Sequence, residues 1–194
     1  LVPGSDRMRP ASPGVKLTYD DFVHFPDDGK RHELIDGEHY VTPTPNLNHQ
    51  SIVGNLYWLI RSHLESRPLG TLFGSPVDVV LSEIDVVEPD LAYVSNERRE
   101  ILTKQNVRGA PDLVVEVGSP STRKRDETIK LRLYERWGVS EYWVVDPELE
   151  TVRVYRRAGE RFESPVELSR ERGERLITPL FPELELPLAR VFST

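Results

Sequence analysis

One stretch of the chain, residues 111–147, constrains the fold more than any other. It reads PDLVVEVGSPSTRKRDETIKLRLYERWGVSEYWVVDP. The apolar runs at 113–117 and 142–145 have the length of buried strands, and the segment between them has helical spacing. The order strand, tight loop, helix, turn, strand predicts a mixed α/β fold in which a central sheet is flanked by helices.

The same stretch places one carboxylate, Glu116, inside an otherwise apolar strand. A buried carboxylate that has no partner is costly enough to take up a proton instead. Glu116 therefore needs a partner or a chemical role, and the candidate site is organised around this residue.

Composition favours a single soluble domain. The chain has 194 residues, of which 38% are hydrophobic and 29% are charged, and this length suits one core. No apolar run approaches the ~20 residues that a membrane span requires. There is no cysteine, which excludes disulfides, thiolate zinc sites and cysteine nucleophiles and fits a cytoplasmic protein. Residues 1–7 resemble an expression scar, so we expect the domain at 8–194.

The charge distribution is uneven. The chain carries a net charge of −7, which does not by itself indicate nucleic-acid binding. Residues 96–137, however, contain ten basic and seven acidic side chains, a local excess of three positive charges. This segment is either a set of solvated helix faces or a surface that follows backbone phosphates, and the second interpretation rests on Arg123, Lys124 and Arg125.

We expect the N-terminal half to contain a short helix, a hairpin, a long helix and two strands. A short helix is expected at 18–25, and Asp36-Gly37 predicts a type I′ turn in a hairpin at 32–42. Asn46 or Asn48 is expected to cap a helix that ends near residue 66. Strands are expected at 71–81, with a break at 74–76, and at 86–94, interrupted by Pro89.

The C-terminal half predicts one helix on the sheet and several short strands. The helix is expected at 123–137, with Ile129, Leu133 and Trp137 as its core stripe and Gly138 as its cap. Further strands are expected at 142–145, 151–155 and 161–168, followed by a proline-rich tail that packs as short strands.

Side-chain alternation identifies a partner for Glu116. Asp112 and Glu116 share one strand face but lie about 13 Å apart, too far to hold one Mg²⁺ together. Asp90, on the preceding strand, is the better candidate, because neighbouring strands are about 4.8 Å apart. Two close carboxylates repel each other unless a cation such as Mg²⁺ or Mn²⁺ lies between them.

A third candidate comes from the helix. Asp126 and Lys130 are four residues apart and so share one helix face, and Tyr134 continues that face. A lysine beside a metal-bound water can orient the nucleophile or neutralise charge that develops on phosphorus.

These residues match a known family. The segments VEPDLAYV and 109–147 closely resemble the Uma2 (DUF820) family of restriction-endonuclease-like proteins, and HELIDGEHYVTPTPNLNHQSIVGNL resembles its opening hairpin and helix. The resemblance implies the PD-(D/E)XK nuclease fold, with an added N-terminal hairpin and C-terminal strands. It implies that Asp90, Glu116 and Lys130 are the catalytic residues, with Glu33 and His49 at typical family positions.

One departure is visible. The usual pattern is (D/E)-X-K, but Glu116 is followed by Val117 and Gly118, so Lys130 would have to reach the site from the helix. Structural alternatives stay open at this point. In these alternatives Lys130 is a surface lysine, Glu116 forms a structural salt bridge to Arg123 or Arg125, and the other site candidates are structural residues.

The resemblance implies a Mg²⁺- or Mn²⁺-dependent endonuclease that acts on DNA as a homodimer. Asp90, Glu116 and the Val117 carbonyl would hold the metal, and Lys130 would act on the attacking water. Two alternatives remain: a nuclease-fold module that binds or assembles with little turnover, and a hydrolase of small phosphoesters.

Overall fold

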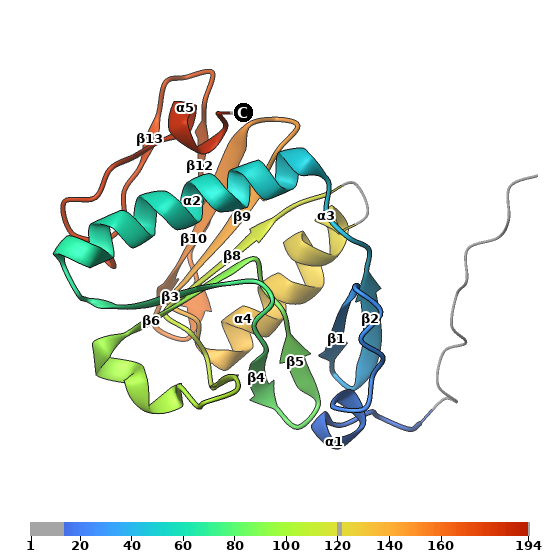
Figure 1. Cartoon of the computed structure of the whole chain (residues 1–194). Helices are drawn as coiled ribbons and strands as arrows, with labels where there is room; N and C mark the ends of the chain where they lie inside the picture. Colours follow the sequence, from blue (N-terminus) through green and yellow to red (C-terminus); the bar gives the residue numbers. More distant parts are fainter. Residues whose placement is uncertain (1–13, 120–121, 194) are drawn as a thin grey trace, which may run out of the picture.

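Two β-sheets form the framework of the protein (Figure 1). The computed structural model describes residues 14–119 and 122–193. The larger sheet has the order β11-β10-β9-β8-β6-β3, with β12 paired to β10. Its strands are β3 Gly70–Gly74, β6 Leu91–Ser95, β8 Leu113–Val117, β9 Glu141–Asp146, β10 Thr151–Ala158, β11 Arg161–Phe162 and β12 Val166–Ser169.

The stretch 111–147 lies at the centre of this sheet. Strands β8 and β9 run parallel, with a helical crossover between them, whereas β6 and β10 pair antiparallel on either side. Parallel strands require such a crossover, because a tight turn cannot join them. The prediction of a mixed sheet with flanking helices is therefore confirmed.

The smaller sheet has the order β2-β1-β5-β4-β7. Its hairpin turns at Asp36 and Gly37, which both have positive φ (53° and 73°), as a type I′ turn requires. The predicted hairpin is therefore confirmed. The strands are β1 Arg31–Ile35, β2 Glu38–Thr42, β4 Val79–Ser82, β5 Asp85–Val87 and β7 Val107–Arg108.

Two predicted strands are divided between the sheets. Residues 71–81 form β3 in the larger sheet and β4 in the smaller one, and residues 86–94 divide in the same way into β5 and β6. The predicted breaks at 74–76 and Pro89 are correct, but the expectation of one strand on both sides of each break is wrong. Proline has no N–H to continue a ladder, so the chain leaves one sheet at Pro89 and enters the other.

Helix α2 (Leu47–Ser66) covers one face of the larger sheet. It begins at Asn46, whose side chain accepts a hydrogen bond from the His49 N–H at 2.9 Å. The contribution of such a cap is typically about 1 kcal/mol. Apolar side chains of α2 pack on Leu113, Val115 and Val117 of β8 and on the C-terminal tail.

The other face of the larger sheet packs against the crossover helix and the smaller sheet. The crossover consists of α3 (Arg123–Arg125), a π-helical turn η2 (Asp126–Lys130) and α4 (Leu131–Trp137), and it ends at Gly138 in the left-handed region. Val114 faces this side, so the strand alternation also directs Glu116 toward it.

The predicted apolar stripe of this helix is wrong at two positions. Leu133 is buried, but Ile129 and Trp137 are 38% and 37% exposed. The wider π turn shifts the phase of the helix at Ile129, and the buried residues are Asp126, Lys130, Leu133 and Tyr134. Trp137, at the end of α4, donates through Nε1 to Asp85 at 3.2 Å.

The remaining elements are short. They are α1 Tyr19–Phe22, the 3₁₀ helix η1 Asn96–Ile101, β13 Arg175–Leu176, β14 Leu186–Pro187 and α5 Leu188–Val191. The tail packs on α2 as a cover of short strands, as predicted, and adds one short helix, α5, that was not predicted. Of the helices in the described parts of the chain, none has the length and apolar character to cross a membrane. The expected scar at residues 1–7 lies outside the described residues.

Candidate active site

Charged side chains from several segments line one cavity of about 160 Å³. Asp90 lies between β5 and β6, and Glu116 lies on β8. Because Leu91 pairs antiparallel with Val115, Asp90 and Glu116 are neighbours across the two strands. The hairpin, the first turn of α2, α3 and η2 supply the other ionisable side chains: Arg31, Glu33, His49, Arg125, Asp126 and Lys130.

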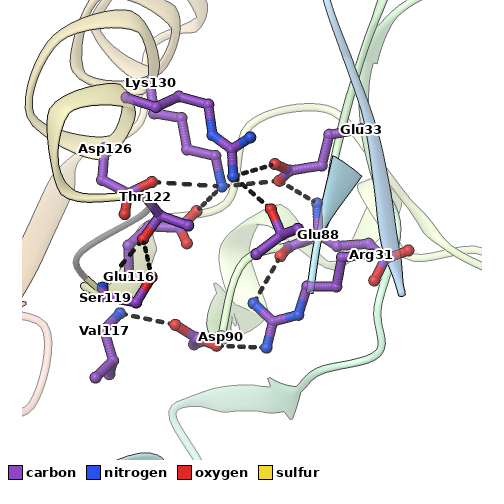
Figure 2. A network of polar contacts seen from close by, with 12 residues as sticks. Arg31, Glu33, Glu88, Asp90, Glu116, Val117, Ser119, Thr122, Asp126 and Lys130 are labelled. Atoms are coloured by element: carbon purple, nitrogen blue, oxygen red, sulfur yellow. Dashed lines mark hydrogen bonds and ion pairs between the residues drawn. The ribbon is translucent and has the colours of Figure 1, made fainter. Parts of the chain in front are cut away.

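The carboxylate of Asp90 is 1% exposed and has three polar neighbours. Arg31 donates a hydrogen bond to Oδ1 at 2.6 Å, and the Val117 N–H donates to Oδ2 at 2.7 Å (Figure 2). His49 Nε2 lies 3.2 Å from Oδ2. Burial alone would raise the pKa of Asp90, but His49 and Arg31 outweigh burial and hold that pKa below its usual value. Asp90 is therefore ionised.

Lys130 is 2% exposed and lies among three carboxylates. Its Nζ is 2.8 Å from Oε1 of Glu33, 2.8 Å from Oε1 of Glu116 and 3.9 Å from Oδ1 of Asp126 (Figure 2). Burial alone would lower the pKa of Lys130, but these carboxylates, Glu116 first, raise it above its ordinary value. Lys130 is therefore a buried, charged residue, and the interpretation as a surface lysine is wrong.

Negative charge around Lys130 is only partly neutralised. Oε2 of Glu33 and Oδ1 of Asp126 are buried and, within the described residues, have no hydrogen-bond partner. Burial, together with the nearby Asp126 and Glu33, raises the pKa of Glu116 to about 8 against the opposing effect of Lys130. Burial also raises the pKa of Asp126. A group of carboxylates with this excess of charge attracts a cation.

Tyr134 contributes a second donor to Glu116. Its hydroxyl donates to Oε1 at 2.8 Å, the same oxygen that Lys130 contacts. Oε1 of Glu116 is thus held in place by two donors.

The donor set fits a hard divalent cation. Carboxylate and backbone carbonyl oxygens are the ligands that Mg²⁺ prefers. The N–H of Val117 points to Asp90, and in an extended strand the carbonyl of the same residue points to the same side. Among residues 14–119 and 122–193, no group of three or more histidine, aspartate or glutamate side chains is arranged to hold a metal ion. Asp90, Glu116, the Val117 carbonyl and water would form the ligand set.

Of the three basic residues at 123–125, Lys124 and Arg125 differ in where their side chains lie. Arg125 points inward, where it donates to Thr42 and lies 3.6 Å from Oε2 of Glu33, and its guanidinium lies over the ring of Tyr40. Lys124 is exposed. The side chain of Arg123 lies outside the described part of the structure. The alternative of a bridge from Glu116 to an arginine is wrong for Arg125, since the basic partner of Glu116 is Lys130.

The sequence reasoning missed Arg31 and Glu88. Arg31 lies two residues before Glu33, so strand alternation would have placed both side chains on the same face of β1. The backbone N–H of Glu88 donates to Oε1 of Glu33 at 3.0 Å. Burial, followed by the charges of Asp78 and Glu33, raises the pKa of Glu88 to about 7.

The comparisons with known proteins show the family and the fold. The Uma2 family model, described as a putative restriction endonuclease, matches residues 19–189. The chain belongs to the Uma2 family. The fold of this Uma2 protein is similar to the crystal structure of a putative nuclease of DUF820 from Anabaena variabilis, with a TM-score of 0.77 and 22% sequence identity. The similarity covers 91% of this chain and 97% of the other, and confirms the predicted fold. No curated protein matches the chain.

Proposed function

We propose that this Uma2 protein is a Mg²⁺- or Mn²⁺-dependent endonuclease that hydrolyses phosphodiester bonds in DNA. One observation carries the proposal: Asp90 and Glu116, on neighbouring strands, border the same cavity, and Lys130 contacts Glu116. The family description and the relative from Anabaena variabilis both name a nuclease, which supports the reaction class.

Each residue has a physical role in this proposal. Asp90, Glu116 and the Val117 carbonyl would hold the cation. A bound Mg²⁺ would polarise a phosphoryl oxygen and lower the pKa of a coordinated water. Lys130 is held in its charged form by the carboxylates around it, so it would stabilise negative charge on the phosphoryl group rather than accept a proton. Glu33 and Tyr134 would position Lys130 and Glu116.

The proposed substrate and assembly follow from the same chemistry. Exposed basic residues such as Lys124 would contact backbone phosphates, and binding would weaken as salt rises. We propose a homodimer, because two copies of the site can cut the two strands of a duplex in one encounter. We also propose one domain over residues 8–194 and a cytoplasmic location, the latter because the chain lacks cysteine. Light scattering in solution tests the dimer.

A second candidate function has a specific observation in its favour. Arg31 and Lys130 already form ion pairs with Asp90 and Glu116. Because both carboxylates are already paired with basic side chains, the protein would serve as a module that binds nucleic acid or protein without catalysing hydrolysis. The cavity of about 160 Å³ would alternatively suit a small phosphoester.

The first test is calorimetric titration with Mg²⁺ and Mn²⁺, followed by incubation with plasmid DNA. We expect stoichiometric binding and metal-dependent nicking by the wild type, and loss of both in Asp90→Ala and Glu116→Ala. Glu97→Ala removes an exposed carboxylate outside the cavity and serves as the control. Binding without cleavage of DNA or model esters would favour the binding module. Absence of binding would refute the metal site.

A further inference from the structure

A second group of ionisable side chains lies on the hairpin. Side chains of β1 alternate between two faces, so His32 points away from the face that Arg31 and Glu33 present to the cavity. Nδ1 of His32 lies 2.9 Å from Nε2 of His39 on β2. The two rings are nearly parallel, with an angle of 16° between their planes.

Asp28 fixes the protonation pattern of this pair. Its Oδ1 lies 3.0 Å from Nε2 of His32, and this hydrogen bond is the largest cause that lowers the pKa of Asp28 to about 2. Asp28 is thus a carboxylate and accepts the Nε2–H, which leaves the lone pair of His32 on Nδ1. A carboxylate behind an imidazole is the arrangement that orients metal-binding histidines in proteins.

The spacing of the two ring nitrogens suits a shared ion. Histidine nitrogens bind zinc at about 2.0–2.1 Å. At ligand–metal–ligand angles of roughly 90–110°, two such nitrogens lie about 2.9–3.4 Å apart. The observed 2.9 Å falls at the lower end of this range. In the metal-free pair the Nε2–H of His39 donates to Nδ1 of His32, so an ion would enter as the pair opens and this proton moves to Nδ1 of His39.

The surroundings of His39 are partly apolar. The ring of Phe25 lies 4.2 Å from that of His39, measured between centroids. Burial, followed by the neighbouring His32, lowers the pKa of His39.

We propose that His32 and His39 bind one late first-row transition ion, such as Zn²⁺, Ni²⁺ or Cu²⁺, with Asp28 as a positioning residue and water in the remaining coordination positions. This site is chemically distinct from the cavity. Imidazole nitrogens favour transition metals, whereas the carboxylates of Asp90 and Glu116 suit Mg²⁺ and Mn²⁺. Occupancy would join the two strands of the hairpin that presents Arg31 and Glu33.

The test is titration of the chain, prepared without a polyhistidine tag, with Zn²⁺ and Ni²⁺ in excess Mg²⁺. We expect one ion per chain, binding at least tenfold weaker in His39→Gln, and about 10- to 100-fold weaker in Asp28→Asn. His63→Gln is the matched control, because His63 lies in the last turn of α2, far from the hairpin (Figure 1). Asp90→Ala and Glu116→Ala should still bind Zn²⁺.

Two further readouts do not depend on variants alone. Zn²⁺ should raise the melting temperature of the wild type but not that of His39→Gln. It should also shift the imidazole nitrogen resonances of His32 and His39 in the wild type, which tests the site even if a variant fails to fold. Absence of Zn²⁺ binding by the wild type, or binding that persists in His39→Gln and disappears in Asp90→Ala, would overturn the proposal.

Discussion

Arg31 and Asp90 form an ion pair, 2.6 Å between Nη2 and Oδ1, that joins the N-terminal hairpin to the junction between the two sheets. Asp90 is almost fully buried, and the Arg31 side chain is only 18% exposed. The guanidinium therefore neutralises the aspartate that we propose as a metal ligand, and it competes with any cation for the same carboxylate.

This competition predicts the behaviour of Arg31→Gln. Removal of the positive charge should tighten Mn²⁺ binding about three- to tenfold, since a cation would no longer face a neighbouring guanidinium. The metal-free protein should lose about 1–3 kcal/mol of unfolding free energy, because Asp90 stays buried without its partner. Calorimetric titration and urea denaturation measure the two effects.

Arg153→Gln provides the control for Arg31→Gln. Arg153 forms a similar 2.8 Å ion pair with Glu127, but at a more exposed position outside the cavity. It should change stability by less than about 1 kcal/mol and leave Mn²⁺ affinity unchanged. Equal Mn²⁺ affinity in Arg31→Gln and the wild type would contradict the competition.

Lys130→Met should destabilise the metal-free protein strongly. The substitution keeps the bulk of the side chain but removes the ammonium group that lies among Glu33, Glu116 and Asp126, and loss of one partner from a buried ion pair typically costs about 3–5 kcal/mol. We expect a loss of about that size at pH 8, and a smaller loss at pH 5, where the carboxylates take up protons. Urea denaturation at both pH values measures it, with exposed Lys124→Met as the control. A loss below 1 kcal/mol at pH 8 would show that Lys130 does not neutralise this cluster.

Glu116 should make the stability of the metal-free protein depend on pH. Its pKa in the folded protein, about 8, lies above its ordinary value of 4.5, so between these values the folded state binds more protons than the unfolded state. The stabilisation is complete below about pH 4.5 and is lost as the pH rises through about 8. Relative to Glu116→Gln, the wild type should lose a few kcal/mol between pH 5 and pH 9. Thermal or urea unfolding in the presence of a chelator measures this difference, and parallel pH profiles would contradict it.

The π turn predicts a contrast between two neighbouring positions of the crossover helix. Leu133→Ala removes a buried side chain and should reduce the unfolding free energy by about 2–5 kcal/mol. Ile129→Ala acts on a side chain that is 38% exposed and should cost less than half as much. Chemical denaturation of both variants measures the contrast. Similar losses would mean that the helix keeps the regular phase expected from its sequence.

Local patterns in the sequence predicted much of the fold. Asp36-Gly37 located the hairpin turn, Asn46 was one of two predicted caps for α2, and alternation along β8 separated Val115 from Glu116. These features depend on a few neighbouring residues, so a short window contains the necessary information. The division of β3 from β4 and of β5 from β6 depends on which sheet each half joins, and local propensity does not contain that information.

The candidate site was predictable where strand alternation and helix spacing applied. Both rules brought Asp90, Glu116 and Lys130 together as candidates, and the structure places their side chains around one cavity. Arg31 was not foreseen, because an arginine at a strand start usually faces solvent. The outward position of Ile129 depends on the π turn, for which the sequence offered no signal.

The polar network of the cavity also bears on how the chain is synthesised. Glu33 leaves the ribosome early, within a hairpin that needs only local contacts, whereas Lys130 follows after the smaller sheet but only β3, β6 and β8 of the larger sheet have been translated. Until that lysine arrives, Glu33 and Glu116 have no ammonium group between them. A partly synthesised chain would therefore hold these two carboxylates without the lysine that joins them in the folded protein.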